Sequence, residues 1–491
     1  MARNSGSILR GVGVVALGAL LAMLTWGFPT IYANRYEQPA ASSTAASPAT
    51  HPKPSAEQDR IYTEETVTKA RNPGVAVMGR DGYLFLGDAF LSNFAQALGR
   101  RYYSPQEVSR TTATIESERS WLKARKIPME FVVAPAKWSI YPDKLPAWSD
   151  GQRLQHIVDQ LLTYDPKSIL DLRPDLTAAR SSHEPYSKKN SHWSPYGGYV
   201  AFGSIVRQLE ARHPGLGTIH VPKLSSVTTV NDQNEFAPLI KDPGPNDWTI
   251  PHFAPDLPGY DIILANGARA PQAPGTRLDV SQGPFQTASA TAGNTHRVLI
   301  LADSTVSSLS PYLATGFGST LIVRHYIDDP VRAPNIPALV ESYHPDLVLT
   351  ITTERNLNEP IRDLEMWQSA LDYDRAAKDS TASWTASGAA GSAIAVVGPT
   401  NLSGHLTAKL PKQLTTSAAI RLTVDSSAPA MIALQGSTTA GPFSIPLRLG
   451  AGANTTFATV PAGITNQTFT LVRTSGSGAA TTKEISARGL P

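Results

Sequence analysis

The sequence predicts an α/β domain, built on a parallel sheet with helices on both faces, followed by a smaller all-β sandwich. Three runs of the chain are apolar without interruption, at residues 298–301, 321–323 and 347–349. Strands that are apolar throughout and separated by helical segments are typical of a parallel sheet that is buried on both faces. Beyond residue 385, short runs instead alternate between apolar and polar residues and are separated by turn residues, which is typical of a sandwich.

The composition limits the class of protein. The chain has 491 residues, enough for two or more domains with a full α/β core. The net charge of +3 is small and no long run of Lys and Arg occurs, so nucleic acid is not an expected partner. The chain has no cysteine, which excludes disulfides, thiolate metal sites and cysteine nucleophiles.

The amino-terminal segment, residues 1–33, predicts export. Arg3 and Arg10 precede an uncharged apolar run at 11–28, which is just long enough to span a bilayer as a helix. The alternative is a signal peptide cleaved after Ala33, although the run is long for one and the preceding residues make a poor cleavage site. Both interpretations place the rest of the chain in the periplasm, and an uncleaved helix would anchor it to the inner membrane.

The chain after this segment is expected to have three parts. Residues 34–70 include a stretch rich in Ala, Ser, Thr and Pro and are expected to be a flexible linker. The α/β domain is assigned to 71–380, with residues 221–292 as an irregular, Pro- and Gly-rich insertion beside the site. Residues 385–491 form the predicted sandwich, whose surface of few charges fits a carbohydrate-binding module or a packing domain.

The first half of the α/β domain is predicted to alternate between strands and helices. Ser104, Pro105 and Glu107 form a capping box with proline in the first turn, which predicts the start of a helix. Further helices are expected around Ile157 and Tyr199 from their apolar periodicity. The strands expected here are residues 82–86, 131–135 and 169–172.

The apolar run at 298–301 leads directly to Asp303 and Ser304. Open α/β sheets bind ligands at the carboxyl ends of their strands, so a serine there presents its hydroxyl to a ligand. If a helix begins next, its free N–H groups point at the same place and stabilise an oxyanion. The alternative interpretation is that Ser304 only caps that helix.

A second chemical signal is the segment 190–198, Asn-Ser-His-Trp-Ser-Pro-Tyr-Gly-Gly. Ser194 and Pro195 predict a helix start, which places His192 in the loop just before the helix. A serine nucleophile needs such a base because its hydroxyl reacts weakly at its free pKa. Metal binding is the rival role for His192, but no second ligand stands at suitable spacing, so neither a metal nor a cofactor is expected.

Several short sequence motifs follow one another along residues 75–370, and their order matters as much as their residues. They are residues 79–85, 133–138 with 141–146, 191–193, 303–304, and 345–348 with 354–357. On these motifs the chain resembles the SGNH-hydrolase-like alginate O-acetyltransferases of the AlgX and AlgJ type. The resemblance implies a modified SGNH fold in which the histidine motif precedes the serine. It also implies periplasmic acetylation of an exopolysaccharide, with acetyl groups delivered by a membrane-bound O-acyltransferase, and a carboxyl-terminal sandwich that binds polysaccharide.

The chain departs from the family pattern at two positions. Asn190 stands where the family has its catalytic Asp, and Ala302 replaces a glycine before Asp303. Asn orients a histidine but contributes little to stabilising the imidazolium, and in a serine protease the Asp→Asn exchange lowers turnover by roughly 10⁴. The protein is therefore expected to be slower, to recruit another carboxylate, or to have lost catalysis.

The sequence thus predicts Ser304 as nucleophile, His192 as general base and acid, and Asn190 as the residue that orients His192. Five residues are candidates for substrate binding, with a packed loop, salt bridge or cap as the alternative: Lys137, Trp138, Tyr141, Arg355 and Asn356. The expected function is periplasmic O-acyl transfer to a secreted polysaccharide. The alternatives are a deacetylase or esterase that uses water, and a catalytically degenerate glycan-binding scaffold. The sequence does not identify the polymer, whether alginate, cellulose or another glycan.

Overall fold

The computed structural model describes residues 53–69, 73–241, 244–327, 329, 332–376, 383–385, 395–396, 406–409, 416–476 and 478–490. The predicted membrane anchor at 1–33 therefore lies outside the described residues. Among the residues described, no helix combines the length and the apolar character needed to cross a bilayer.

The end of the predicted linker is helical. Helix α2 (Ala56–Thr63) begins at a capping box formed by Ser55 and Gln58, and a π-helical turn, η1 (Glu64–Thr68), follows it. Arg60 also pairs with acidic residues one turn away on both sides, which supports a short helix. The expectation of a flexible linker up to residue 70 is therefore wrong for this stretch.

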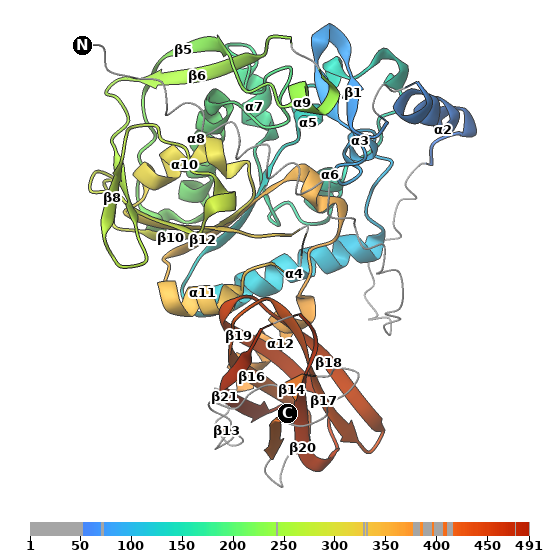
Figure 1. Ribbon diagram of the computed structural model, residues 1–491, viewed down its shortest axis with the longest axis vertical. Coiled ribbons are helices and arrows are strands. Elements are labelled where there is room, and N and C mark those ends of the chain that lie inside the picture. Colours follow the sequence, from blue (N-terminus) through green and yellow to red (C-terminus); the bar gives the residue numbers. More distant parts are fainter. Residues whose placement is uncertain are drawn as a thin grey trace, which may run out of the picture. The chain divides into compact units, whose positions relative to one another are not determined.

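The central sheet, in the described part of the chain, has eight strands in the order β4-β3-β12-β10-β11-β9-β7-β8, of which Figure 1 labels β8, β10 and β12. Its first five strands are parallel. Their bounds are β3 (Met129–Ala134), β4 (Leu170–Asp171), β10 (Arg297–Ala302), β11 (Ser319–Arg324) and β12 (Leu347–Thr353). The predicted parallel sheet is confirmed, because the apolar runs at 298–301, 321–323 and 347–349 all lie within its strands.

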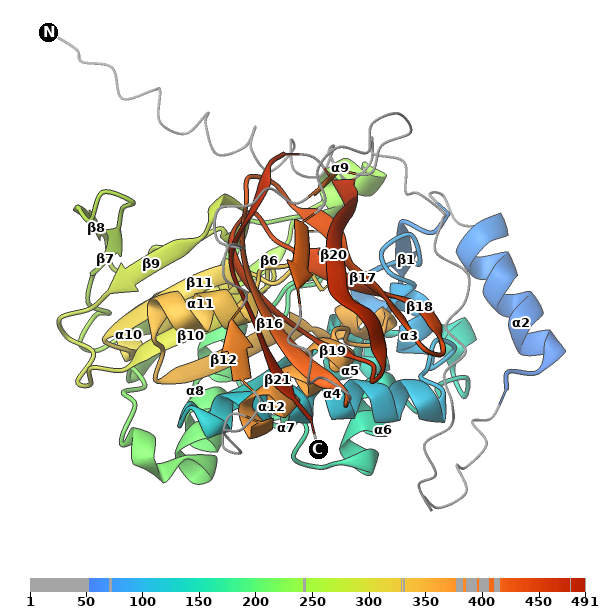
Figure 2. The same ribbon diagram turned by 90° about the horizontal axis from the view of Figure 1, so that it is seen from below.

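The sequence analysis expected segment 221–292 to be irregular. The structure corrects this, because the segment forms strands. Two of them, β5 (Leu224–Asn231) and β6 (Asp247–Phe253), pair as a hairpin. The other three extend the central sheet antiparallel beyond β11, as Figure 2 shows for β9. They are β7 (Tyr260–Ile263), β8 (Arg269–Gln272) and β9 (Phe285–Ala288). Each of these three strands has only four residues, which is too short for a hydrophobic period to reveal it.

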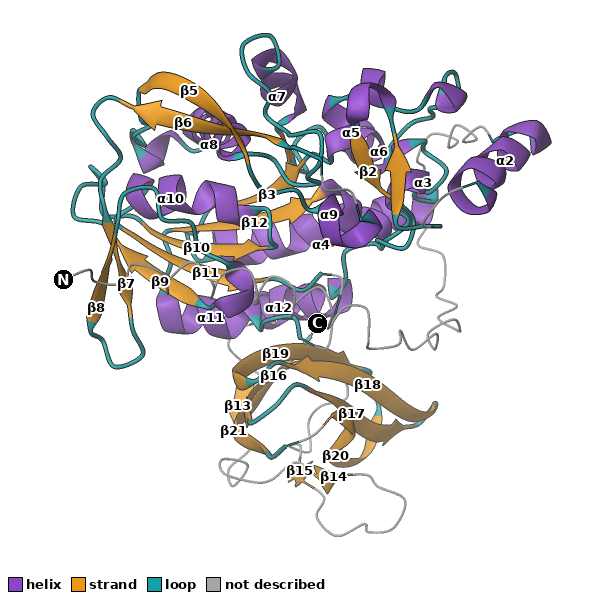
Figure 3. Ribbon diagram, turned by 45° about the horizontal axis from the view of Figure 1, so that its top comes forward, coloured by secondary structure: helices purple, strands orange, loops and turns teal. Residues whose placement is uncertain are grey.

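Helices cover both faces of this sheet (Figure 3). On one face, α8 (Pro195–Arg212) and α10 (Val306–Gly316) share a core with Val298 and Ile300 of β10. On the other face, α4 (Pro105–Ala124) and α11 (Ile336–Tyr343) pack with Leu299 and Leu301. The remaining elements are β1 (Ala76–Met78), β2 (Leu84–Leu86), α3 (Asn93–Ala97), α5 (Lys137–Ile140), α6 (Ile157–Tyr164), α7 (Arg173–Ala179), α9 (Phe236–Ile240) and α12 (Leu364–Ala376).

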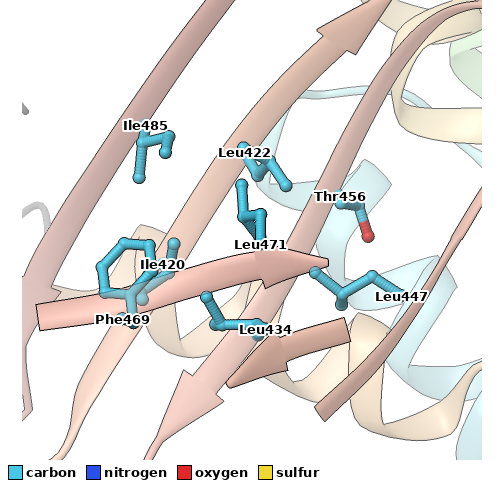
Figure 4. Close-up of a pocket in the computed structure, with 9 residues that line it drawn as sticks. Ile420, Leu422, Leu434, Leu447, Thr456, Phe469, Leu471 and Ile485 are labelled. Carbon is cyan, nitrogen blue, oxygen red and sulfur yellow. The ribbon is translucent and has the colours of Figure 1, made fainter. Parts of the chain in front are cut away.

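The carboxyl-terminal part is all β, as predicted. In its described residues, one sheet has the order β13-β21-β16-β19 and the other β14-β20-β17-β18, with β15 paired to β20. Apolar side chains of both sheets fill the space between them (Figure 4). The strands are β13 (Ser383–Thr385), β14 (Ala395–Val396), β15 (Leu406–Lys409), β16 (Ala418–Ser426), β17 (Ala430–Thr438), β18 (Gly441–Leu449), β19 (Gly452–Val460), β20 (Ile464–Gly476) and β21 (Ala480–Gly489).

One buried acid in α4 makes stability depend on pH. The side chain of Glu118 is buried, and its Oε1 has no hydrogen-bond partner within the described residues. Burial raises the pKa of Glu118 from its usual 4.5 to about 8. Because the folded state holds the proton more tightly, the stability that Glu118 contributes is fully present below about pH 4.5 and is lost as the pH rises towards 8.

Glu118→Gln should therefore stabilise the protein increasingly between about pH 5 and pH 8. Each pH unit in this window corresponds to at most about 1.4 kcal/mol. Thermal unfolding at several pH values measures the effect as a Tm gain that grows with pH. Glu116→Gln is the matched control, since Glu116 lies on the same helix with its side chain 57% exposed. Equal Tm changes at all pH values would contradict the assignment.

Candidate active site

Strand β10 leads into helix α10, and Figure 1 labels both elements. Ser304 lies in the turn between them, at the carboxyl edge of the parallel strands. The turn is closed by a hydrogen bond of 3.2 Å from the Val306 N–H to the Asp303 carbonyl. Asp303 and Thr305 are buried, whereas Ser304 is partly exposed. The strand and the helix therefore present the Ser304 hydroxyl at the place where the sequence predicted a nucleophile.

The Asp303 carboxylate fixes this turn to the end of β12. Its Oδ1 accepts hydrogen bonds from Thr305 N (2.9 Å) and Oγ1 (2.6 Å). Its Oδ2 accepts from Thr353 N (2.6 Å), Thr353 Oγ1 (2.8 Å) and Asn356 Nδ2 (2.7 Å). Burial raises the pKa of Asp303, but these hydrogen bonds and nearby cationic side chains outweigh burial and hold the pKa below its ordinary value.

His192 lies opposite Ser304 in the loop before α8. Its Nε2 is 2.8 Å from Ser304 Oγ. Asn190 Oδ1 accepts a hydrogen bond from the His192 backbone N–H (2.8 Å) and lies 3.3 Å from His192 Nδ1. An amide oxygen at Nδ1 favours the tautomer with its proton on Nδ1, which leaves Nε2 free to accept the Ser304 proton. The structure thus brings together the three residues that the sequence singled out.

Helices α8 and α10 touch through their backbones, which sets the separation of His192 and Ser304. A Cβ added at Gly198 would lie 2.5 Å from the Ser308 carbonyl oxygen, so only glycine fits there. Next to it, Trp193 Nε1 donates a hydrogen bond of 2.9 Å to the Thr305 carbonyl. Both contacts join the residues that flank His192 to those that follow Ser304.

Glu235, which the sequence analysis did not identify, also lies beside His192. Its Oε2 accepts from Ser191 N (2.6 Å), its Oε1 accepts from Ser191 Oγ (3.0 Å), and its Oε2 is 3.9 Å from His192 Nδ1. Burial raises the pKa of Glu235, but His192 and the donors of Ser191 outweigh burial and set the pKa at about 2. Glu235 stands between β5 and α9, in the segment expected to be irregular. The only sequence signal for it was the missing carboxylate at 190.

The predicted sugar contacts at Lys137, Trp138 and Tyr141 are wrong. Their side chains are 3%, 2% and 0% exposed, respectively. Lys137 Nζ donates a hydrogen bond of 2.8 Å to the Lys188 carbonyl, and the Tyr141 hydroxyl donates to Glu184. Lys137 and Tyr141 thus hold the chain just before the histidine loop, as a packed loop does, and Trp138 Nε1 donates to Asn93 Oδ1 (3.2 Å).

The other two predicted substrate-binding residues follow β12 in the turn η7 (Glu354–Asn358). The amide of Asn356 donates to Asp303, so Asn356 acts on the nucleophile turn. Arg355 is partly exposed, and its charge is felt at Asp303, so its contact with substrate stays a prediction. Within the described residues, no group of three or more His, Asp or Glu side chains has the arrangement of a metal site.

Residues 76–241 match a family described as the SGNH hydrolase-like domain of acetyltransferase AlgX, which confirms the predicted resemblance for this part of the chain. Asn190, His192 and Glu235 lie inside the matched residues, and Ser304 lies beyond them. No curated protein matches the chain.

Solved structures with a similar arrangement include AlgX of Pseudomonas aeruginosa. It is 12% identical and covers 85% of this chain and 94% of its own, with a TM-score of 0.47. The O-acetyltransferase domain of Pseudomonas putida AlgJ is 16% identical, covering 58% of this chain and 93% of its own, with a TM-score of 0.35. Bacillus cereus PatB1 is 14% identical, covering 59% and 98%, with a TM-score of 0.42.

Gly198→Ala should separate His192 from Ser304 and lower turnover. The added methyl group collides with the Ser308 carbonyl, so α8 and α10 must move apart by a few tenths of an ångström or more. A misplacement of about 1 Å at a reacting group costs on the order of 10²-fold in rate. Ester turnover and Tm, measured together, test this.

Gly203→Ala is the matched control for this change. Gly203 lies on the same helix, and the nearest atom to an added Cβ is 3.9 Å away. Alanine there should therefore keep activity and add up to about 1 kcal/mol of stability through helix propensity. Equal activity of both variants would show that the contact at Gly198 does not set the geometry of the site.

Proposed function

We propose that this protein transfers acyl groups to a secreted polysaccharide in the periplasm, through an acyl-enzyme formed on Ser304. The observation that carries the proposal is the 2.8 Å contact between His192 Nε2 and Ser304 Oγ at the carboxyl edge of the sheet. The match to an acetyltransferase domain over residues 76–241 supports acetyl as the acyl group and an exopolysaccharide as the acceptor. No cofactor is needed for this chemistry.

The first half of the reaction loads the enzyme. His192 Nε2 takes the hydroxyl proton of Ser304 as Oγ attacks the carbonyl carbon of the acyl donor. The oxyanion forms beside the start of α10, where the Ser304 N–H is our candidate donor. The intermediate then expels the leaving group of the donor, which receives the proton from Nε2. Asn190 Oδ1 keeps the imidazole oriented throughout.

The second half of the reaction consumes the acyl-enzyme. A sugar hydroxyl gives its proton to His192 Nε2 and attacks the acyl carbon, and the collapse of the intermediate releases the acylated sugar. Ser304 recovers its proton from His192. If water takes the place of the sugar hydroxyl, the same steps make the protein a deacetylase or esterase, so the acceptor alone separates these two functions.

Several partners follow from the family resemblance and belong to the proposal. A membrane-bound O-acyltransferase would act as the acetyl donor system, and the predicted helix at 11–28 would hold the protein at the inner membrane. The carboxyl-terminal sandwich would bind the polysaccharide. A catalytically degenerate scaffold is the rival to all enzyme functions, and the intact contact between His192 and Ser304 favours the enzyme.

Ser304→Ala and His192→Ala should each abolish turnover of a chromogenic acetyl ester. The double variant should be no slower than either single one, because residues that act as a unit are not additive. Ser307→Ala, one turn further along α10, is the control that should stay active. If Ser304→Ala keeps its activity, the nucleophile lies elsewhere, and if the wild type turns over no ester, the scaffold function replaces this one.

Acetyl transfer to an oligosaccharide should exceed hydrolysis when the acceptor is present. Mass spectrometry of the sugar products, with the acetyl ester as donor, measures transfer, and the released acetate measures hydrolysis. Products that remain unacetylated with every acceptor, while acetate is released, would make the protein an esterase. Ser304→Ala should lose transfer and hydrolysis alike, because both pass through the same acyl-enzyme.

A further inference from the structure

We propose that Glu235 supplies the negative charge for His192 that a carboxylate at position 190 would otherwise supply, and that Asn190 keeps only the orienting role. The inference rests on the proposed function, because it concerns the imidazolium that forms as Ser304 attacks. It divides between two side chains two tasks that a single Asp performs in a Ser-His-Asp triad. Glu235 does not contact the reacting atoms, so it is a positioning residue for His192.

Three oxygens lie near Nδ1 of His192, and the Ser191 hydroxyl, at 3.4 Å, is one of them. Asn190 Oδ1, at 3.3 Å, is close enough for a hydrogen bond, whereas Glu235 Oε2, at 3.9 Å, is at the distance of an ion pair. The carboxylate is fixed there because the N–H and the hydroxyl of Ser191, the residue next to His192, each donate to one of its oxygens. Its charge is therefore held next to the imidazole before the reaction begins.

Glu235 is ionised wherever the enzyme would work. Burial opposes ionisation, but His192 and the Ser191 donors more than compensate and set the pKa of Glu235 at about 2. Its side chain is 19% exposed, so water screens the interaction with His192 only in part. A carboxylate in this environment stabilises the imidazolium relative to the neutral ring, which is the contribution that Asn190 cannot make.

The amide of Asn190 also explains why position 190 holds Asn. Its Nδ2 donates a hydrogen bond of 2.8 Å to the carbonyl of Gln233, two residues before Glu235. An Asp at 190 would lose this donor and place an oxygen against the Gln233 carbonyl. It would also bring a second negative charge close to Glu235. Asn190 therefore ties the segment that carries Glu235 to the histidine loop.

Further contacts hold this segment in place. The Glu235 N–H donates to the Lys189 carbonyl (3.0 Å), so the backbones of the two segments are joined. Asn246, the residue before β6, accepts from Lys189 N (2.9 Å) and donates to the Gln233 carbonyl (3.2 Å). The position of Glu235 is thus set by hydrogen bonds on both sides of the site.

Kinetics of the full-length protein test the proposal. Glu235→Gln keeps the shape of the side chain and removes its charge, so kcat for an acetyl ester should fall by at least about 10-fold, within the roughly 10⁴ of the protease precedent. KM should stay unchanged, because the charge acts on the transition state, whereas Tm should fall, because an amide replaces the charged acceptor of both Ser191 donors. Asp232→Asn is the matched control: it removes an exposed carboxylate from the same segment and should leave kcat unchanged.

A rescue separates charge from structure. Asn190→Asp should lower the activity of the wild type or leave it unchanged, because Glu235 already serves His192. In the Glu235→Gln background, however, the same exchange should restore kcat at least several-fold, because it returns a carboxylate to the imidazole. If Glu235 had only a structural role, the Glu235→Gln exchange would not turn Asn190→Asp from a neutral or harmful change into one that raises kcat. If Asn190→Asp fails to rescue, the proposal is overturned.

Labelling of Ser304 distinguishes failure of this inference from failure of the proposed function. Phenylmethanesulfonyl fluoride reacts with an activated serine, and intact mass measures the rate without any sugar acceptor. Wild type should label at Ser304, and Glu235→Gln should label at least about 10-fold more slowly, in step with its kcat. A wild type that neither labels nor hydrolyses esters overturns the proposed function. A Glu235→Gln protein that labels and hydrolyses like the wild type overturns only the role of Glu235.

Discussion

The backbone contact between α8 and α10 is the constraint on which the site depends. His192 precedes one helix and Ser304 precedes the other, and more than a hundred residues separate them in the sequence. Because glycine at 198 lets the two helices meet without an intervening side chain, the imidazole reaches the hydroxyl at 2.8 Å. The Trp193 hydrogen bond to the Thr305 carbonyl fixes the rotation of the loop about that contact. A hydrogen bond of this length needs both helices to be placed within a few tenths of an ångström.

The same arrangement explains why so much buried polar structure surrounds Ser304. A turn that exposes one hydroxyl must satisfy its other polar groups internally, since buried donors and acceptors without partners are costly. Asp303 does this by accepting five hydrogen bonds from Thr305, Thr353 and Asn356. It thereby links β10 to the end of β12. Ser304 is held by the sheet itself and not by its own turn alone.

The sequence predicted those features of the fold that depend on neighbouring residues, and missed those that depend on distant ones. Parallel strands such as β10 and β12 are buried on both faces, so their apolar runs are continuous and visible in a single sequence. Helix starts were equally visible, because the caps at Ser104 and Ser194 are local. Strands β7 and β8 extend the sheet through backbone hydrogen bonds, but each has only four residues, so no hydrophobic period revealed them.

The same difference separates the site residues whose surroundings could be predicted from those whose surroundings could not. Ser304 and His192 stand in short motifs whose local structure, a strand end and a helix start, could be inferred from neighbouring residues. Lys137, Trp138 and Tyr141 have side chains that often bind sugar, but residue type carries no information about exposure, and all three are buried. A side chain can be assigned to a substrate only when the tertiary packing around it is known.

Glu235 shows the limit of reasoning from one position at a time. From the sequence, Asn190 indicated weakened catalysis, because a triad that lacks its carboxylate stabilises the imidazolium poorly. The structure shows instead that the amide at 190 binds the carbonyl of Gln233 and so fixes the segment that bears another carboxylate. The meaning of Asn190 therefore depends on a residue more than forty positions away, in a segment without any recognisable motif. Asn190 and the segment that carries Glu235 therefore form one structural unit, in which the insertion lies beside His192.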